Sequence, residues 1–541
     1  MPTAERSSSR NGSPREPEEP QHEVVIIGAG LSGIGMAIAL REAGIEDFAI
    51  LERAGDVGGT WRDNTYPGIG VDIPAQAYQF SYELKPDWSG VYASGAEVKA
   101  YVDQCVERYG IRPFIRFDSE VTERAWDPEH QLWRLKLADG EVTARFVIGA
   151  IGPFVEPKRC EISGVEDFAG KTIKSAKWDH DYDLAGKRAA IVGTGASAVQ
   201  IIPKIARTLG HLDVYQRTPI WVAPKTNFRT PGAVKAIFRR FPAVQNLVRA
   251  GYTAFVEFIL IFMVVNHRRI PFVANGLAKV LRERWYPSQV PDPELRRKLT
   301  PEYGFGCKRP AVSNSYLRTF TRENVELITD PIARVTETGV ETADGRLREV
   351  DVLILATGFR LASDPEVFRG KPVSGRDGFD LATAYQDERL RSYEGISLPR
   401  LPNHFMMFGP FGWTGGTWHQ LVETTSTHIV RVIREAQRRG AREVEVRDDA
   451  TDRWTEDVRE RLANSLWHHN SCGTANSYYF DHHGDTPFLR PTSAAQARKA
   501  SRTFPLEDYI FTAPRALAAP ERRERAAASA RRWDSPSAGD G

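Results

Sequence analysis

The sequence predicts an α/β protein, and three observations carry this prediction. A buried-strand pattern, a glycine-rich turn, an amphipathic helix and a second strand follow one another from Glu23 to Glu52. The same order returns from Lys187 to Arg217. Because parallel strands need a helical crossover, each segment is expected to form a βαβ unit of a parallel sheet. The chain should therefore hold two Rossmann-like dinucleotide-binding domains.

Composition and charge narrow the class of protein. The 541 residues suggest about three or four structural units, and 72 Lys and Arg nearly balance 70 Asp and Glu. This balance argues against a globally basic nucleic-acid binder. Four cysteines lie far apart without a CxxC pair, and the first 20 residues have no apolar signal-like segment. We therefore expect a cytoplasmic protein without a disulfide framework.

The first glycine-rich turn has the arrangement that binds a dinucleotide. Gly28 makes the tight turn, Gly30 lets the backbone approach a pyrophosphate, and Gly33 allows the helix to pack closely on the strand. Glu52 ends the next strand, 24 residues after Gly28, where a carboxylate accepts hydrogen bonds from ribose hydroxyls. The pattern indicates a site for FAD.

The second turn differs at the ribose end. Gly193, Thr194 and Gly195 begin it, and the third glycine position is Ala198, which the pattern tolerates. The position equivalent to Glu52 is Arg217, a cation suited to a 2′-phosphate. The second site is therefore expected to bind NADPH rather than NADH.

Composition shifts along the chain divide it into seven segments. Between Pro224 and Pro301, aromatic and aliphatic residues alternate with arginines, which indicates a helical insertion near the substrate pocket. The expected organisation is a disordered leader (1–21), an FAD-binding domain in two parts (22–155 and 360–512), an NADP-binding domain in two parts (156–224 and 301–359), the insertion (225–300) and a flexible tail (513–541).

With both turns placed, the chain resembles the class B flavoprotein monooxygenases, and among them the Baeyer–Villiger group. The resemblance runs from about Glu23 to Tyr509. It rests on these motifs: GGTW at 58–61, YPGIGVD at 66–72, Phe168-Ala169-Gly170 with Trp178-Asp179, QRTP at 216–219, GCKR at 306–309, ATGF at 356–359 and FGP at 408–410. One fingerprint position departs from the family, because Lys174 stands where the family has His. A lysine cannot act as the neutral donor and acceptor that an imidazole is.

The resemblance implies an FAD-containing, NADPH- and O2-dependent monooxygenase that converts ketones to esters or lactones through a flavin C4a-peroxide. Arg309 is the expected catalytic cation, and Asp72 would orient it. Lys308 would join Arg217 and Thr218 at the NADP phosphate. The full set of expected cofactor-binding residues is Gly28, Gly30, Ser32, Gly33, Glu52, Thr60, Trp61, Asp72, Tyr78, Val121, Gly193, Thr194, Gly195, Ser197, Arg217, Thr218, Lys308 and Arg309.

Two other functions remain open at this point. Lys174 makes a flavin-dependent N- or S-oxygenase on the same scaffold more credible, and a reductase that binds both cofactors without transferring oxygen is the other alternative. His468, His469, Cys472, His482 and His483 crowd one stretch, but their spacing fits no zinc pattern, so no metal site is expected. The partners expected are a ketone or another lipophilic small molecule and O2, with no nucleic acid.

An apolar stretch at 250–265, followed by His267, Arg268 and Arg269, has two interpretations. Its roughly 16 residues are too few to span a bilayer, which needs about 20. It is an interfacial helix that gives peripheral membrane contact through 250–269, or a buried helix that covers the active site. The sequence favours the buried helix.

Overall fold

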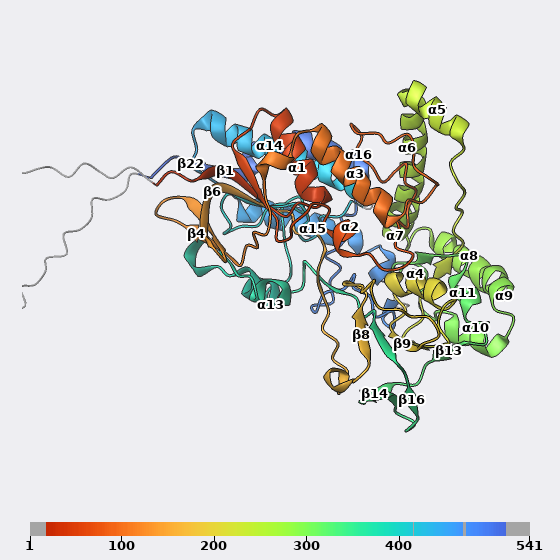
Figure 1. The fold of residues 1–541 in the computed structure, drawn as a ribbon. Coiled ribbons are helices and arrows are strands. Elements are labelled where there is room, and N and C mark those ends of the chain that lie inside the picture. Colours follow the sequence, from red (N-terminus) through yellow and green to blue (C-terminus); the bar gives the residue numbers. More distant parts are fainter. Residues whose placement is uncertain (1–17, 415, 469–471, 516–541) are drawn as a thin grey trace, which may run out of the picture.

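Two sheets, the first mixed and the second parallel, form the centre of the computed structural model, which describes residues 18–414, 416–468 and 472–515 (Figure 1). In the first, β1 (His22–Ile27) pairs in parallel with β2 (Phe48–Leu51) and β6 (Gly140–Gly149), and α1 (Leu31–Glu42) connects β1 to β2. The strand order is β19-β4-β5-β6-β1-β2-β3, with β20 also paired to β6. The elements β1, α1 and β2 form the first predicted βαβ unit.

The second sheet contains the second predicted unit. Its strand order is β13-β10-β9-β17-β8, and every neighbouring pair is parallel. The helix α4 (Ala196–Ile205) connects β9 to β10. The strands are β8 (Lys171–Lys174), β9 (Arg188–Val192), β10 (His211–Tyr215), β13 (Val325–Ile328) and β17 (Val352–Leu355).

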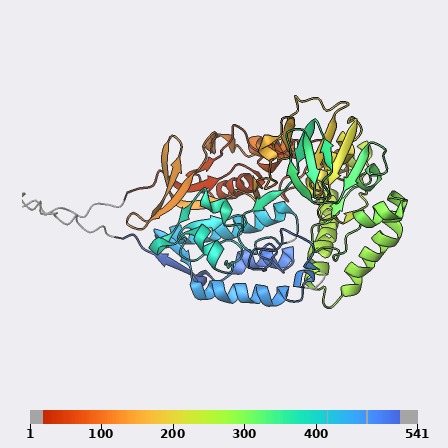
Figure 2. The same cartoon turned by 90° about the horizontal axis from the view of Figure 1, so that it is seen from below.

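The chain crosses between the two sheets twice. The outward segment, β7 (Phe154–Pro157), pairs antiparallel with the return segment, β18 (Phe359–Leu361), so the second sheet's domain is inserted within the first. Seen from below, the two sheets form separate groups, and the green helices of residues 232–299 lie at the outer edge of the second (Figure 2). The fold class predicted from the sequence is confirmed.

The long helix α14 (Trp418–Arg439) packs against α1. Thr417 accepts a hydrogen bond from the backbone of Gln420, and the Gln420 side chain accepts one from the backbone of Thr417, a capping box that starts the helix. Val422 comes so close to Gly35 of α1 that a Cβ there would lie 2.4 Å from Val422 Cγ1. Glycine at this position lets the two helices touch.

Shorter elements complete the two domains. Around the first sheet lie α2 (Thr60–Asp63), α3 (Gly95–Arg108), β3 (Ile115–Arg116), β4 (Glu123–Asp127), β5 (Leu132–Leu137), α12 (Glu366–Arg369), β19 (Val373–Ser374), α13 (Leu381–Asp387), β20 (His404–Met406), β21 (Glu443–Val446), α15 (Asp448–Leu462), α16 (Ala494–Thr503) and β22 (Tyr509–Thr512). Around the second lie β11 (Val222–Ala223), β12 (Ala311–Val312), α11 (Tyr316–Thr319), β14 (Ile332–Val335), β15 (Gly339–Thr342) and β16 (Leu347–Glu349).

Helices also form the segment between β11 and β12. They are α5 (Gly232–Arg240), α6 (Pro242–Glu257), a π-helical continuation η3 (Phe258–Phe262), α7 (Met263–Val265), α8 (Pro271–Val280), η4 (Leu281–Trp285), α9 (Tyr286–Gln289) and α10 (Pro293–Leu299). Figure 1 shows α5 and α6 projecting beyond both sheets at the upper right. No helix among the described residues combines the length and apolarity needed to cross a bilayer.

The expectation of a buried helix at 250–265 is wrong. Phe255, Phe258 and Phe262 remain between 47% and 56% exposed, although Val256 and Ile261 between them are buried. The helix therefore has one apolar face against the protein and another apolar face exposed to solvent. Because both faces are apolar, the hydrophobic pattern of the sequence does not show which of them is buried.

The cysteine prediction is also wrong for one pair. Cys307 and Cys472 form a disulfide although 165 residues separate them, whereas Cys105 and Cys160 are free. The fold brings together two loops that are distant in sequence, and spacing along the chain does not show such a pair. The predicted leader and tail lie largely outside the described residues, which exclude 1–17 and 516–541.

Candidate active site

A cavity of about 1880 Å³ runs between the two glycine-rich turns. Its wall includes these 17 of the 18 residues expected to bind cofactor: Gly28, Gly30, Ser32, Glu52, Thr60, Trp61, Asp72, Tyr78, Val121, Gly193, Thr194, Gly195, Ser197, Arg217, Thr218, Lys308 and Arg309. Gly33 does not line the cavity. It faces the strand side of the turn, where an added Cβ would lie 1.9 Å from the Gly28 carbonyl oxygen.

The first turn leaves the start of α1 open to an anion. Gly28 has a φ of +106°, and a Cβ there would lie 2.9 Å from the Ala150 carbonyl oxygen. Gly30 is the N-cap of α1, and no side chain caps its first turn. The free backbone N–H groups at this helix end suit a pyrophosphate, so the residues present fit the FAD that the glycine pattern implies.

Glu52 lies at the carboxyl end of β2, with only 5% of its side chain exposed. Its Oε2 accepts a hydrogen bond from Ala29 N at 2.8 Å, and its Oε1 lies 2.9 Å from Arg62 NH1. These bonds fix the carboxylate beside the first turn, where a ribose would lie. Burial acts to lower the pKa of Arg62, but the Glu52 and Asp63 carboxylates outweigh it and raise that pKa.

The second turn repeats the backbone of the first. Gly193 has a φ of +109°, and a Cβ at Gly193 would lie 2.5 Å from the Ala356 carbonyl oxygen. Gly195 is the uncapped N-cap of α4, and a Cβ there would meet no atom within 4 Å. Open space beside free N–H groups fits the second dinucleotide. Thr194 Oγ1 donates to the Thr218 carbonyl oxygen at 3.1 Å and ties this turn to the end of β10.

Two cations lie together at the ribose end of the second turn. Burial, and then the positive charge of Arg217, lowers the pKa of Lys308. Among the described residues, neither cation has a carboxylate within 4 Å. Arg217 Nε donates to the Asn476 side-chain oxygen at 3.2 Å when that amide is oriented to satisfy both groups. A pair of adjacent, uncompensated cations is suited to a phosphate group.

Arg309 and Asp72 form an ion pair on the cavity wall. Arg309 Nε and NH2 each lie 2.8 Å from Asp72 Oδ2, and the guanidinium lies 5.7 Å from the centre of the Trp413 ring. Burial acts to lower the pKa of Arg309, but the charge of Asp72 outweighs it and raises that pKa above the ordinary arginine value. The guanidinium therefore stays charged at any working pH.

Aromatic side chains surround this ion pair. Trp61 Nε1 donates to the Tyr78 hydroxyl at 3.2 Å, and burial raises the pKa of Tyr78, so its phenol stays protonated. Tyr478 also lines the cavity, and burial raises its pKa well above the ordinary value. Trp413, Trp418, Phe480 and Phe488 add further apolar surface to the wall.

Lys174 does not line the cavity, although its bridge partner Lys177 does. Lys174 is the last residue of β8, its side chain is exposed, and it pairs across an isolated bridge with Lys177. The later fingerprint residue Asp179 instead forms an ion pair with Lys171 at 2.5 Å. Phe408 of the FGP motif does not line the cavity; its ring centre lies 5.4 Å from that of Trp418, which does.

In the histidine-rich stretch, the rings of His482 and His483 lie 4.0 Å apart, and other members contact different partners. Cys472 is bonded to Cys307, His482 Nε2 lies 2.9 Å from the Gln386 carbonyl oxygen, and His469 is outside the described residues.

Sequence reasoning missed several residues of the cavity wall. Arg124 of β4 is buried, and burial lowers its pKa to about 10, while Arg62, Asn476 and Trp418 reach the cavity from three other segments. Trp418 Nε1 donates to Ser32 Oγ at 3.0 Å and so connects α14 to the first turn. No local motif marks these side chains, because only the folded arrangement brings them to the turns.

Known proteins resemble this chain over most of its length. Residues 25–240 match the pyridine nucleotide-disulphide oxidoreductase family. A Baeyer–Villiger monooxygenase of Streptomyces coelicolor is 35% identical over 91% of this chain and 93% of its own length. Another Baeyer–Villiger monooxygenase, from Pseudomonas aeruginosa, is 37% identical over 93% of this chain and 94% of its own.

A solved structure shows the same architecture with its cofactors bound. The crystal structure of OTEMO in complex with FAD and NADP matches with a TM-score of 0.81 at 27% identity. The match covers 92% of this chain and all of the OTEMO chain.

Proposed function

Since the chain belongs to the Baeyer–Villiger monooxygenase family, we propose that Arg309 and Asp72 are its catalytic pair and that ketones are its substrates. The protein is an FAD- and NADPH-dependent monooxygenase that uses O2 and a small-molecule substrate. The observation that carries the proposal is the Arg309–Asp72 ion pair on the wall of one cavity that reaches both glycine-rich turns.

The flavin, when bound, supplies the oxygen-transfer chemistry, with electrons from NADPH. We propose that the first turn, Glu52 and Arg62 hold FAD. Gly28 and Gly30 let its pyrophosphate approach the start of α1, and Glu52 receives the ribose hydroxyls. Buried Arg124 adds a cation to the same end of the cavity.

We propose that Arg217, Lys308 and Thr218 bind the 2′-phosphate of NADPH, with Asn476 holding Arg217 in place. The adjacent cations support this role because their mutual repulsion is relieved by a bound dianion. The pyrophosphate would lie at Gly193, Gly195 and the open start of α4. No acid occupies the strand end that Glu52 occupies in the first domain, which favours NADPH over NADH.

Arg309 stabilises negative charge that develops on the carbonyl oxygen of the substrate during attack. Asp72 fixes the direction of the guanidinium and offsets the cost of burying it. Because Arg309 does not lose its proton, it acts as a fixed electrostatic group rather than as a general acid. Trp61, Tyr78 and Trp413 exclude water from the same region, which strengthens the interaction.

A lipophilic ketone is the substrate class that the cavity supports best. Aromatic rings dominate the wall near Arg309, so an apolar body can be buried while one carbonyl meets the cation. Lys174, which made N- or S-oxygenation more credible, is exposed outside the wall and gives no support to that alternative. A panel of ketones and a thioether, incubated with the enzyme, NADPH and air, tests the substrate class by product analysis.

We also propose a cytoplasmic location and peripheral membrane contact through 250–269. Dependence on NADPH supports the location, whereas the Cys307–Cys472 disulfide counts against a strongly reducing surrounding. Exposed Phe255, Phe258 and Phe262 support the contact. Fractionation of cells that express the protein distinguishes cytosol, membrane-bound fraction and exported material.

A further inference from the structure

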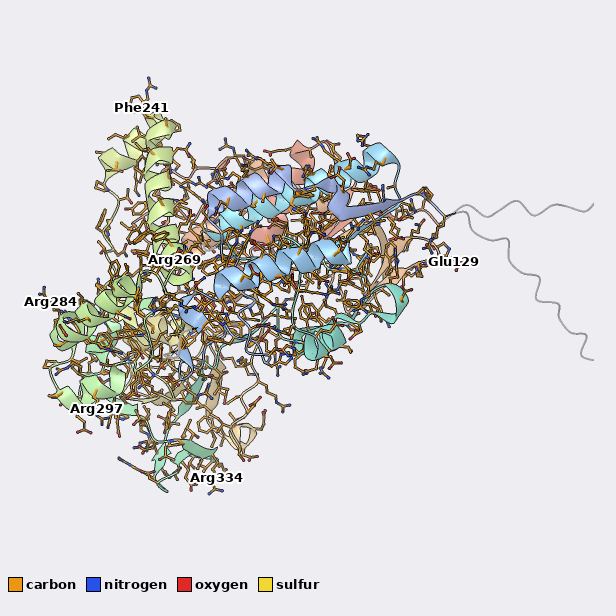
Figure 3. The ribbon with its side chains drawn as sticks, turned by 180° about the vertical axis from the view of Figure 1, so that it is seen from behind. Glu129, Phe241, Arg269, Arg284, Arg297 and Arg334 are labelled. Atoms are coloured by element: carbon orange, nitrogen blue, oxygen red, sulfur yellow. A yellow bond between two sulfur atoms is a disulfide. The ribbon has the colours of Figure 1, made fainter. Side chains whose placement is uncertain are left out.

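The helical insertion carries a surface whose chemistry differs from the rest of the molecule. We call residues 228–285 the arm; it contains α5, α6, η3, α7, α8 and η4. Figure 3 shows Phe241 at its outer end and Arg269 near its base. No residue of the arm lines the active-site cavity among the described residues. The exposed surface of the arm is thus separate from the catalytic site.

The helix α6 is turned with its polar face inward. Gln245, Arg249 and Thr253, spaced four residues apart, are all buried. Gln245 Nε2 donates to Gln76 Oε1 at 2.9 Å and to the Lys85 carbonyl oxygen at 2.7 Å. The hydrogen bonds of Gln245 and the 3.9 Å approach of Arg249 NH2 to Glu423 Oε1 therefore fasten α6 to the body of the protein. An ordinary surface helix instead turns its polar face to solvent.

The outward face of the arm is apolar. Val244, Leu247, Phe255, Phe258 and Phe262 follow one another at helical spacing and are 43% to 74% exposed. The arm holds ten of the fourteen exposed large apolar side chains among the described residues: Phe228, Ile237, Phe241, Val244, Leu247, Phe255, Phe258, Phe262, Phe272 and Val280. A concentration of this kind marks an interaction surface rather than scattered surface residues.

The arm is rich in basic residues. The arm has ten Lys and Arg but only two acidic residues, whereas the whole chain is nearly neutral at +2. Both acids are engaged, since Glu257 accepts a hydrogen bond from Ala494 N at 3.1 Å and Glu283 lies 3.9 Å from Lys279. Exposed Arg268 and Arg269 have no carboxylate within 4 Å in the described part of the chain.

We propose that the arm docks on an anionic lipid surface, with its exposed cations, Arg268 and Arg269 among them, at the headgroups. Phe241 and the apolar stripe of α6 and η3 would enter the interface; the stripe consists of Val244, Leu247, Phe255, Phe258 and Phe262. This inference rests on the proposed membrane contact and deepens it, because it extends the contact to α5 and α8 and assigns the charge of the lipid. Phenylalanine rings and leucine side chains enter the boundary between the headgroups and the acyl chains. Lysine and arginine side chains attract acidic headgroups.

Charge disfavours a second copy of the chain on this surface. A two-fold dimer would place the arm's positive surface opposite itself, since an isologous interface repeats the same patch. Like charges across an interface oppose association. An anionic bilayer instead supplies opposite charge and an apolar layer together.

Vesicle co-sedimentation of the full-length, FAD-loaded protein tests the proposal. Vesicles of phosphatidylcholine alone are compared with vesicles that also contain phosphatidylglycerol, at about 0.1 M and about 1 M salt, between which the screening length falls from about 10 to about 3 Å. We expect partition onto the anionic vesicles to be at least about 25-fold stronger at low salt, because Arg268 and Arg269 alone contribute about fivefold each, and most of that preference should be lost at high salt.

Two variants locate the contact, and a third serves as control. Leu247→Glu/Phe258→Glu places charge in the stripe and should weaken partition by about tenfold or more. Arg268→Gln/Arg269→Gln should weaken it by about fivefold for each cation removed. Leu347→Glu changes a side chain that is 45% exposed on β16, outside the arm, and should leave partition unchanged.

Several outcomes overturn the proposal. Equal partition onto neutral and anionic vesicles would leave a membrane contact but remove its anionic specificity. Equal loss in the Leu347→Glu control would mean that the arm is not the docking face. No partition at all, or a dimer in solution that Leu247→Glu/Phe258→Glu dissociates, would assign the surface to something other than lipid. Unchanged turnover of a water-soluble ketone by these variants would show that the oxygenase proposal stands independently.

Discussion

Replacement of Arg309 by alanine is the perturbation that bears most directly on the chemistry. The wild-type guanidinium is held by two N···O contacts of 2.8 Å to one carboxylate oxygen of Asp72, so its direction is fixed before substrate arrives. Loss of one preorganised group that stabilises a developing oxyanion costs about 100- to 1000-fold in rate, or roughly 2.7–4 kcal/mol. We expect Arg309→Ala to lower the kcat for ester formation by that factor.

Reduction of the enzyme by NADPH should survive the same change. Arg309 is not among the cations placed at the 2′-phosphate, so NADPH consumption should continue in Arg309→Ala while ester yield falls. Ester by gas chromatography and NADPH by absorbance at matched enzyme concentration give the two rates separately. Arg360→Ala removes another arginine of the cavity wall, one that lies 3.4 Å from Asp364, and serves as the matched control.

The pH dependence provides a second check on the same residue. Because Asp72 outweighs burial and holds the pKa of Arg309 above its ordinary value, the guanidinium remains charged across the accessible range. The kcat profile of the wild type should therefore show no alkaline limb from Arg309. An ester yield in Arg309→Ala equal to that of the Arg360→Ala control would refute the electrostatic role assigned to Arg309.

Three further predictions concern the rest of the site. Arg217→Ala should raise the KM for NADPH about tenfold and leave the KM for NADH nearly unchanged, since a charged hydrogen bond contributes about 1.5–3 kcal/mol. Equal effects on both nucleotides in steady-state kinetics would count against a phosphate contact. Cys472→Ser should raise the KM for NADPH more than it changes kcat, because the disulfide joins the loop of Lys308 to the loop of Asn476. If the KM of this variant equals that of the wild type in the same buffer, the disulfide does not position the two loops. Gly33→Ala should lower FAD retention and stability by about 1–3 kcal/mol, because its Cβ would lie 1.9 Å from a carbonyl oxygen; a thermal melt equal to wild type would contradict this.

The sequence was sufficient for the two nucleotide-binding units because their signals are local. Gly28 and Gly193 occupy left-handed turns that follow buried strands. Thr417 and Gln420 form the capping box at the start of α14. Each of these features depends on residues within a few positions of one another. The parallel pairing follows from these local signals. Other residues of the cavity wall, such as Asp72, Tyr78 and Arg309, were predicted from the family resemblance.

Other parts depend on contacts between distant segments. Gln245 of α6 is buried because it meets hydrogen-bonding groups from other segments, and Arg249 NH2 lies 3.9 Å from Glu423 Oε1. The apolar run at 250–265 carries no sign of these contacts, so the sequence did not show that one side of the helix is exposed. The partner of Arg217 also could not be predicted, since Asn476 is far from the second glycine turn in sequence. The Cys307–Cys472 bond belongs to the same class of long-range contact.

Product analysis with isotopically labelled dioxygen tests the central claim most directly. The purified enzyme is given NADPH, ¹⁸O2 and a lipophilic ketone, and the products are analysed by mass spectrometry. We predict an ester or lactone that carries one labelled oxygen atom. Recovery of unreacted ketone with hydrogen peroxide from every ketone offered, or sulfoxide as the sole product when a thioether is added, would contradict the assignment of a ketone oxygenase.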